Sequence, residues 1–230
     1  MKQSDIRRER EARRREGYRE MILHAAERVI LRKGYSALTM DDVAREAQLS
    51  KATIYKYVSG KGTLLFEILG HSFDDIRLRM AEIADGPGSA REKLGRIVQA
   101  ILQGNEDMMH FNQVLWMDKA MLKLMRLFAH PPGRPGAAPA ADRKMLIVIK
   151  RKRQELIDIG ARILGEGVES GEFGRMDTAQ AADYIDALLQ GYTHIRLWQG
   201  DAPRLPAAAE DLTRFIIEGI RNPKHSGKET

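Results

Sequence analysis

The residues best suited to binding chemistry lie in one short stretch, LSKATIYKYVSGK, at residues 49–61. Its lysines can donate hydrogen bonds to guanine acceptors, and its threonine and alanine methyl groups can contact the thymine methyl. Its tyrosine hydroxyls and ammonium groups suit phosphate oxygens. So polar a stretch cannot bury much of itself, and a polyanionic partner explains it better than core packing does. The candidate DNA-contacting residues are Thr39, Ser50, Lys51, Ala52, Thr53, Tyr55, Lys56, Tyr57 and Lys61.

Two short predicted helices position these residues. Residues 39–47 begin with a capping box, in which the Thr39 hydroxyl meets the amide of Asp42 while the Asp42 carboxylate reaches back. Ser50 is the N-cap of the second helix. Two short helices joined by a tight turn form a helix-turn-helix, whose second helix enters the major groove with its first residues towards the bases. We expect Lys61, at the start of the following helix, to hold a phosphate.

The helical period continues through most of the chain, and neither an alternating strand pattern nor a solenoid repeat appears. The first helix begins at Tyr18 and is ended by Gly34. Residues 1–16 lack apolar periodicity and form either a mobile arm or a frayed helical extension. The predicted class is all-α, with about nine helices. Further helices are predicted at residues 61–84, from Ser89 onward, in the apolar segment 106–129, and at residues 142–169, 178–199 and 206–221.

Charge is distributed unevenly along the 230 residues, whose net charge is +6. Residues 1–69 carry 15 Lys and Arg against 10 Asp and Glu, whereas the remainder carries 23 against 22. The excess of positive charge in residues 1–69 is explained equally well by an anionic partner of this segment and by a solvated charged face. The absence of cysteine excludes disulfides and thiolate chemistry. No apolar run is long enough for a transmembrane helix, so a soluble cytoplasmic protein is expected.

The arginines near the N-terminus allow two interpretations. They can contact phosphates or enter an adjacent minor groove, or they can form a solubilising tail that pairs with its own glutamates. The sequence leaves these alternatives open. The residues concerned are Arg7, Arg8, Arg10, Arg13, Arg14 and Arg15.

Residues 18–69 resemble the DNA-binding head of the tetracycline-repressor (TetR) family of bacterial regulators. The resemblance rests on the runs ILHAAERVILRKGY and LTMDDVAREAQLSKATIYKYVSGK, followed by LL, and on their spacing. It departs from the family at Lys56, where an aromatic residue is common, and at Gly62, where an acidic residue usually follows the lysine. The first departure concerns the base contacts, and the second the start of the long helix.

The resemblance implies a domain organisation for the rest of the chain. In the family, a three-helix head is joined by a long helix to a helical domain that binds ligand and forms a dimer. The boundaries expected here are residues 1–17 for a basic arm, 18–69 for the helix-turn-helix domain, 70–222 for the ligand-binding and dimerisation domain, and 223–230 for a tail.

A cluster of methionines and aromatic residues is the best candidate for the ligand pocket that the resemblance implies. Methionine fills irregular space and adapts to varied ligands, and such a pocket takes a mostly apolar molecule. The alternative is ordinary core packing at helical spacing. The candidate ligand-binding residues are Phe111, Trp116, Met121, Met125 and Met145.

The last two predicted helices carry matching apolar faces that suit a twofold symmetric contact. Two glycines would let these helices approach closely. The candidate dimer-interface residues are Tyr184, Leu188, Gly191, Tyr192, Ile195, Leu212, Phe215, Ile216 and Gly219.

The function expected from these features is a ligand-responsive transcriptional regulator. The protein would be a homodimeric repressor, released from a palindromic double-stranded operator by a small apolar or cationic effector. A constitutive DNA-binding dimer with a vestigial pocket is the alternative. No catalytic triad, phosphate loop or HExxH motif occurs, so neither an enzyme nor a cofactor is expected. The spacing of His71 with Asp74 and of Glu106 with His110 is better explained by surface pairing than by a metal site.

Overall fold

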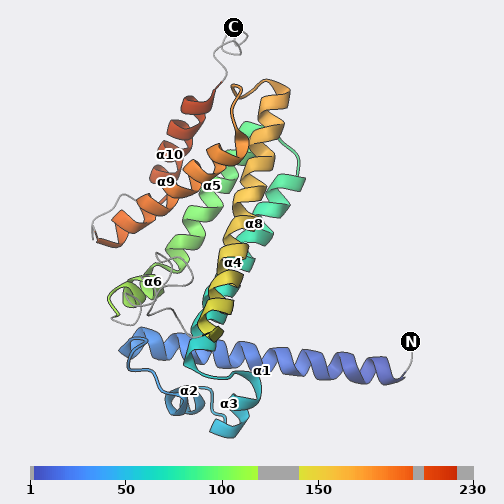
Figure 1. Cartoon of the computed structure of the whole chain (residues 1–230), viewed down its shortest axis with the longest axis vertical. Helices are drawn as coiled ribbons and strands as arrows, with labels where there is room; N and C mark the ends of the chain where they lie inside the picture. Colours follow the sequence, from blue (N-terminus) through green and yellow to red (C-terminus); the bar gives the residue numbers. More distant parts are fainter. Residues whose placement is uncertain (1–2, 119–139, 199–204, 222–230) are drawn as a thin grey trace. The chain divides into compact units, whose positions relative to one another are not determined.

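The computed structural model describes residues 3–118, 140–198 and 205–221. Within these ranges it contains nine α-helices and one isolated β-bridge, which confirms the predicted all-α class (Figure 1). None of the helices in these ranges is both long and apolar enough to cross a membrane. The helices are α1 Gln3–Lys33, α2 Met40–Glu46, α3 Lys51–Tyr57, α4 Lys61–Asp85, α5 Ala90–Asp107, α6 Met109–Trp116, α8 Ala140–Ser170, α9 Thr178–Trp198 and α10 Leu205–Ile220.

The chain divides into two compact units. The first consists of Met1–His71 and His110–Ile149, and the second of Ser72–Met109 and Lys150–Thr230. Helices α4 and α8 each contribute residues to both units.

The first unit is built around α1, on which α2 and α3 pack (Figure 1). Ile22 and Ile30 of α1 are fully buried, as are Val43 of α2 and Ile54 of α3. Gly34 ends α1 with φ of +81°, in the left-handed region that glycine adopts without strain, and its amide donates to the Ile30 carbonyl at 2.8 Å. This helix end lets the chain turn back so that α2 and α3 cover the apolar side of α1.

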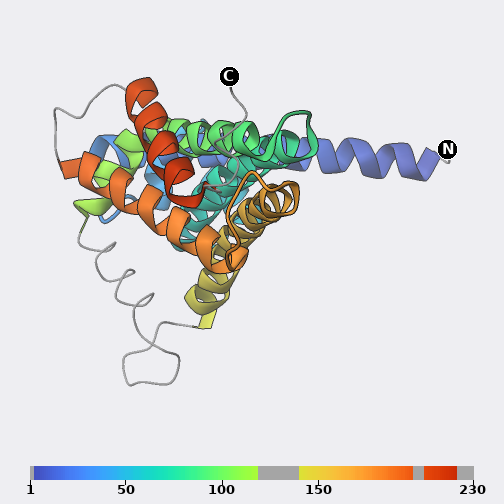
Figure 2. The ribbon, with the colours of Figure 1, turned by 90° about the horizontal axis from the view of Figure 1, so that it is seen from above.

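The second unit is built on the amphipathic helix α5, which packs against α9 and α10 (Figure 2). Leu94, Ile97 and Val98 of α5 are buried in this core. The predicted capping box at the start of α5 is present, with the Ser89 side chain accepting from the amide of Glu92 at 3.2 Å. These contacts make α5 the central helix of the second unit.

Two helix boundaries differ from the sequence-based expectation. Helix α1 begins fifteen residues before Tyr18, so residues 3–16 form a continuous helical extension. The segment expected at residues 106–129 is interrupted at Met108. This residue is the C-cap of α5, and its amide donates a hydrogen bond to the carbonyl of Gly104 before α6 begins. The part of that segment beyond residue 118 lies outside the described ranges.

Candidate nucleic-acid interface

Local capping produces the helix-turn-helix. The Thr39 hydroxyl accepts from the amide of Asp42 at 3.2 Å, and the Asp42 carboxylate accepts from the Thr39 amide at 3.0 Å, so the predicted capping box is confirmed. After α2, Gln48 adopts a positive φ of 55° and reverses the chain. The Ser50 hydroxyl then accepts from the amide of Thr53 at 3.1 Å and starts α3. The turn between the two helices is therefore fixed at both ends.

Helix α3 has one buried and one exposed side. Ile54 is fully buried, and Val58, directly after the helix, is 3% exposed, so these two residues anchor α3 in the core of the head. The side chains of Lys51, Ala52 and Lys56 are exposed. The start of α3 therefore presents the polar groups that the sequence analysis proposed for base contacts.

Lys51 is held by the helix before it. Its ammonium group donates to the Asp41 carboxylate of α2 at 2.8 Å, and this hydrogen bond raises the pKa of Lys51. Both side chains are exposed, so the pair lies on the surface of the head. Reading a base with Lys51 requires this contact to be exchanged for one with DNA.

The two tyrosines of α3 have different surroundings. Tyr57 is half-buried, and its ring stacks on that of Tyr18 in α1 with centroids 5.4 Å apart. The guanidinium group of Arg14 lies 5.7 Å from the centre of the Tyr18 ring. Tyr55 is 49% exposed and projects from the head. Tyr57 thus braces α3 against α1, whereas Tyr55 is open to an external partner.

Lys61 begins α4 next to the loop that follows α1. Its ammonium group donates to the Ser36 carbonyl at 3.3 Å and lies 5.1 Å from the centre of the Tyr35 ring. Thr39, at the start of α2, is exposed. Lys61 therefore holds the start of α4 against the loop that follows α1.

Asp118 is a residue that sequence reasoning missed. It is only 8% exposed, and its carboxylate accepts hydrogen bonds from the Ser36 amide at 2.6 Å and from the Ser36 hydroxyl. It follows α6 and lies 82 residues along the chain from its partner, so no local pattern could reveal the pairing. Asp118 holds the same loop that supplies the carbonyl for Lys61.

Ion pairs tie α1 to α2. The Glu46 carboxylate receives hydrogen bonds from Arg32 at 2.5 Å and from Arg28 at 2.6 Å, which lower its pKa from 4.5 to about 2. Lys33 pairs with Asp42 and, together with Thr39, holds the pKa of that carboxyl well below its usual range. These exposed contacts fix the orientation of α2 on the head.

Most of the candidate ligand-binding side chains lie outside the described part of the chain. Phe111 is described and is 2% exposed in α6. Trp116 and Met145 belong to α6 and α8, but their side chains are not among those described, and Met121 and Met125 lie between the described ranges. The pocket therefore stays a prediction.

The candidate dimer residues are divided between surface and core in the second unit. Tyr184, Ile195 and Phe215 are 66%, 52% and 68% exposed. The surroundings of Gly191 and Gly219 are open. The remaining candidates pack at least partly within the chain, with Leu188, Tyr192 and Leu212 at the edge of the core and Ile216 inside it.

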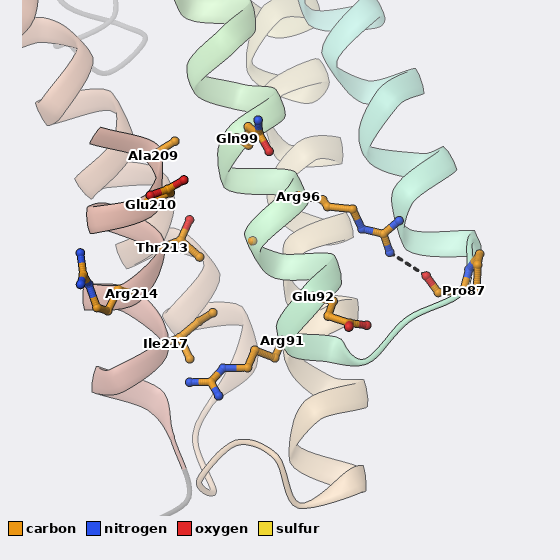
Figure 3. A pocket seen from close by; sticks show the side chains of 11 residues that line it. Pro87, Arg91, Glu92, Arg96, Gln99, Ala209, Glu210, Thr213, Arg214 and Ile217 are labelled. Carbon is orange, nitrogen blue, oxygen red and sulfur yellow. Dashed lines mark hydrogen bonds between the residues drawn. The ribbon is translucent and has the colours of Figure 1, made fainter. Parts of the chain in front are cut away.

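A depression of about 760 Å³ lies between α5 and α10 in the second unit (Figure 3). It contains none of the candidate ligand residues. Two of its polar side chains already have partners, since Arg96 donates to the Pro87 carbonyl at 2.7 Å and Arg214 pairs with Asp211. Among the described residues, no group of three or more His, Cys, Asp or Glu side chains is arranged to hold a metal ion.

An exposed, polar helix held in a helix-turn-helix is the arrangement found in the helix-turn-helix transcriptional regulators. Residues 22–68 match the family described as bacterial regulatory proteins, tetR family. This match covers the helix-turn-helix and supports the resemblance of residues 18–69 to the family.

Three similar proteins show how far the likeness extends. The uncharacterized HTH-type transcriptional regulator YdeS of Bacillus subtilis is 44% identical over 52 residues, which are 23% of this chain and 26% of that protein. This chain thus spans about a quarter of the length of YdeS. The fatty acid metabolism regulator protein of the same species is 22% identical to this chain. The match covers 87% of this chain and 94% of the length of that regulator. The structure of FadR from Bacillus subtilis in complex with stearoyl-CoA has a TM-score of 0.64 at 20% identity, over 88% of this chain and 99% of that one.

Proposed function

We propose that the protein is a homodimeric repressor that binds a palindromic operator and is released from it by a small, mostly apolar or cationic effector. The observation that carries the DNA-binding part is the exposure of Lys51 and Ala52 at the start of α3, while Ile54 fixes the helix from behind. In a helix-turn-helix, this end of the second helix faces the base edges. Tyr55, Lys56 and Lys61 are assigned to the phosphates beside the groove.

The dimer follows from the size of the reading surface. One recognition helix contacts only a few base pairs, so two copies related by a twofold axis are needed to specify a site. Tyr184 and Ile195 on α9 and Phe215 on α10 supply the exposed apolar side chains for this contact. Gly191 and Gly219 leave room for a partner helix.

The effector is proposed to bind among α6, α8 and the segment between them. The residues proposed for this site are Phe111, Trp116, Met121, Met125 and Met145, and among these the structure describes the side chain of Phe111 alone. The FadR structure contains stearoyl-CoA, so a long-chain acyl thioester is the first effector to test. A hydrophobic cation is the second.

The proposed domain organisation keeps the arm at residues 1–17, the head at 18–69, the ligand and dimer domain at 70–222 and the tail at 223–230. Operator binding also implies that the protein acts in the cytoplasm.

The test begins with selection of a binding site from random duplex DNA by the full-length protein. The selected duplex is then titrated in fluorescence anisotropy with and without stearoyl-CoA or a hydrophobic cation. We expect a twofold symmetric site and a loss of affinity when an effector is added. Selection of no site would overturn the proposal. Effector binding with unaltered DNA affinity would leave the constitutive DNA-binding dimer instead.

A further inference from the structure

Helix α1 extends well past the head as one uninterrupted helix (Figures 1 and 2). In the first unit its residues Ile22 to Ile30 form the core with α2 and α3, whereas residues 7–17 are exposed. The exposed part carries all six arginines that the sequence analysis left with two interpretations. Because the segment is helical, each of these side chains has a defined direction.

The arginines gather on the side of α1 that faces the recognition helix. At about 3.6 residues per turn, residues separated by four, seven or eleven positions share a face. Arg7, Arg14 and Tyr18 have this spacing, and Arg10 lies one turn before Arg14. Tyr18 is the residue that stacks on Tyr57 of α3. The arginine face therefore continues the side of α1 on which α3 lies.

The opposite side of the extension is different in charge. Glu9, Glu16 and Glu20 share that side, and Arg13 is paired there with Glu9 at 2.7 Å. Within the described part of the chain, no ion pair joins Arg7, Arg8, Arg10 or Arg15 to a carboxylate, and Glu11 is the one carboxylate of residues 7–15 that shares the face of Arg7 and Tyr18. A tail that merely pairs with its own glutamates would not separate the charges in this way.

We propose that the helical extension lies along the phosphate backbone of the DNA that flanks the half-site read by α3. Packed helices have axes about 8–10 Å apart, and the major groove is about 8.5 Å deep. When α3 occupies the groove, α1 is therefore level with the phosphates at its rim. A helix is about 10–12 Å wide and the minor groove about 6 Å, so the extension does not enter the minor groove.

The reach of the extension sets the expected footprint. Arg7 lies eleven residues before Tyr18, which is about 16 Å along the helix at 1.5 Å per residue. B-DNA carries one phosphate per about 3.4 Å on each strand. The arginine face therefore spans about five phosphates beyond the recognition helix, and these contacts carry no sequence preference.

The proposal rests on the operator binding proposed above, so its experiment must separate the two. The selected duplex is prepared in a short form, cut at the outer edges of the half-sites, and in a long form with eight further base pairs on each side. Anisotropy titrations over a range of salt concentrations compare the forms. We expect the long duplex to bind about tenfold more tightly at low salt, with a steeper salt dependence of about 0.9 for each added phosphate contact.

Two matched variants test the face as well as the charge. Arg10→Gln and Arg13→Gln each remove one positive charge, at positions three residues apart. Of the two residues, only Arg10 lies on the arginine face. Arg10→Gln should reduce the preference for the long duplex, and Arg7→Gln with Arg10→Gln should reduce it further. Arg13→Gln should leave the preference unchanged. Circular dichroism checks that the helix is retained in each variant.

Three results would overturn the proposal. The first is equal affinity for the short and the long duplex, and the second is an equal effect of Arg10→Gln and Arg13→Gln on the preference for the long duplex. The third is binding of the protein to phosphatidylglycerol vesicles through the arginine face while its DNA affinity does not depend on duplex length. In each case specific binding to the short duplex would show that the operator function still stands. Absence of a selected site would instead remove the function on which the proposal rests.

Discussion

At the scale of single residues, two lysines of the head are expected to act differently. Lys61 touches the loop after α1 through the Ser36 carbonyl and is assigned to a phosphate, whereas Lys51 starts the recognition helix. Lys61→Ala should weaken binding to all sequences alike and lower the salt slope by about one unit per site. Lys51→Ala or Thr53→Ala should change the preferred sequence, at about 1–3 kcal/mol for each lost base contact.

These outcomes can be separated by repeating the site selection with each variant and by measuring affinity at several salt concentrations. A changed sequence preference in Lys61→Ala, with an unchanged salt slope, would show that the two roles had been assigned wrongly.

Glu46 predicts a pH dependence of head stability. Its pKa is about 2 in the folded protein, against an ordinary value of 4.5, because Arg32 and Arg28 bind the carboxylate. The ionised form is thus favoured by folding. Its contribution is fully present above about pH 4.5 and is lost as the pH falls towards about 2.

The measurement is the free energy of urea unfolding of wild type and Glu46→Gln as a function of pH. The difference between them should be constant near neutral pH and should shrink through the acidic window. Glu20→Gln, on the exposed side of α1, controls for the loss of a surface carboxylate. A difference that stays constant down to pH 2.5 would contradict the assignment.

At the scale of elements, two glycines in α8 make a matched pair. A Cβ at Gly167 would overlap the Phe173 ring, which is buried in the core of the second unit, whereas a Cβ at Gly165 would meet nothing within 4 Å. Gly167→Ala should lower the free energy of unfolding by about 1–3 kcal/mol, as overpacking does. Gly165→Ala should raise it by about 0.5–1 kcal/mol, because alanine favours the helix. Thermal unfolding of both variants checks the prediction, and equal shifts would contradict it.

Helix boundaries were predictable from the sequence where capping is local. The starts of α2, α3 and α5 follow from Thr39, Ser50 and Ser89, each of which accepts a hydrogen bond from an amide three residues on. The end of α2 was placed correctly by its broken pattern, but the positive φ of Gln48 was not expected, since glycine or asparagine is usual there.

Other features depend on contacts that no local pattern encodes. The helical state of residues 3–16 was left open because charged residues give no apolar period. The bond of Asp118 to Ser36 joins residues 82 positions apart, so only the folded chain reveals it. The polar surface of α3 was predictable for the opposite reason, since this short helix offers little besides Ile54, and Val58 directly after it, that a core could bury.

At the scale of the whole molecule, the proposed dimer can be broken from its surface. Phe215 is 68% exposed on α10, so Phe215→Asp should leave the fold intact while placing two like charges close to the twofold axis. We expect monomers in light scattering at micromolar concentration and weakened operator binding. Gln99→Asp on α5, outside the candidate interface, controls for the added charge. A monomeric wild type, or a dimeric Phe215→Asp protein with full operator affinity, would refute this interface.

The contact between Lys51 and Asp41 has a consequence for how the protein would search a chromosome. In the structure Lys51 holds its carboxylate partner at 2.8 Å, and in the proposed complex an acceptor on the DNA would have to replace that partner. Under the proposed DNA binding, Asp41 would compete with the DNA for Lys51, most effectively at sites that offer poor acceptors. Asp41→Asn would free Lys51, strengthen binding to random DNA more than to the operator, and lengthen each pause at a wrong site.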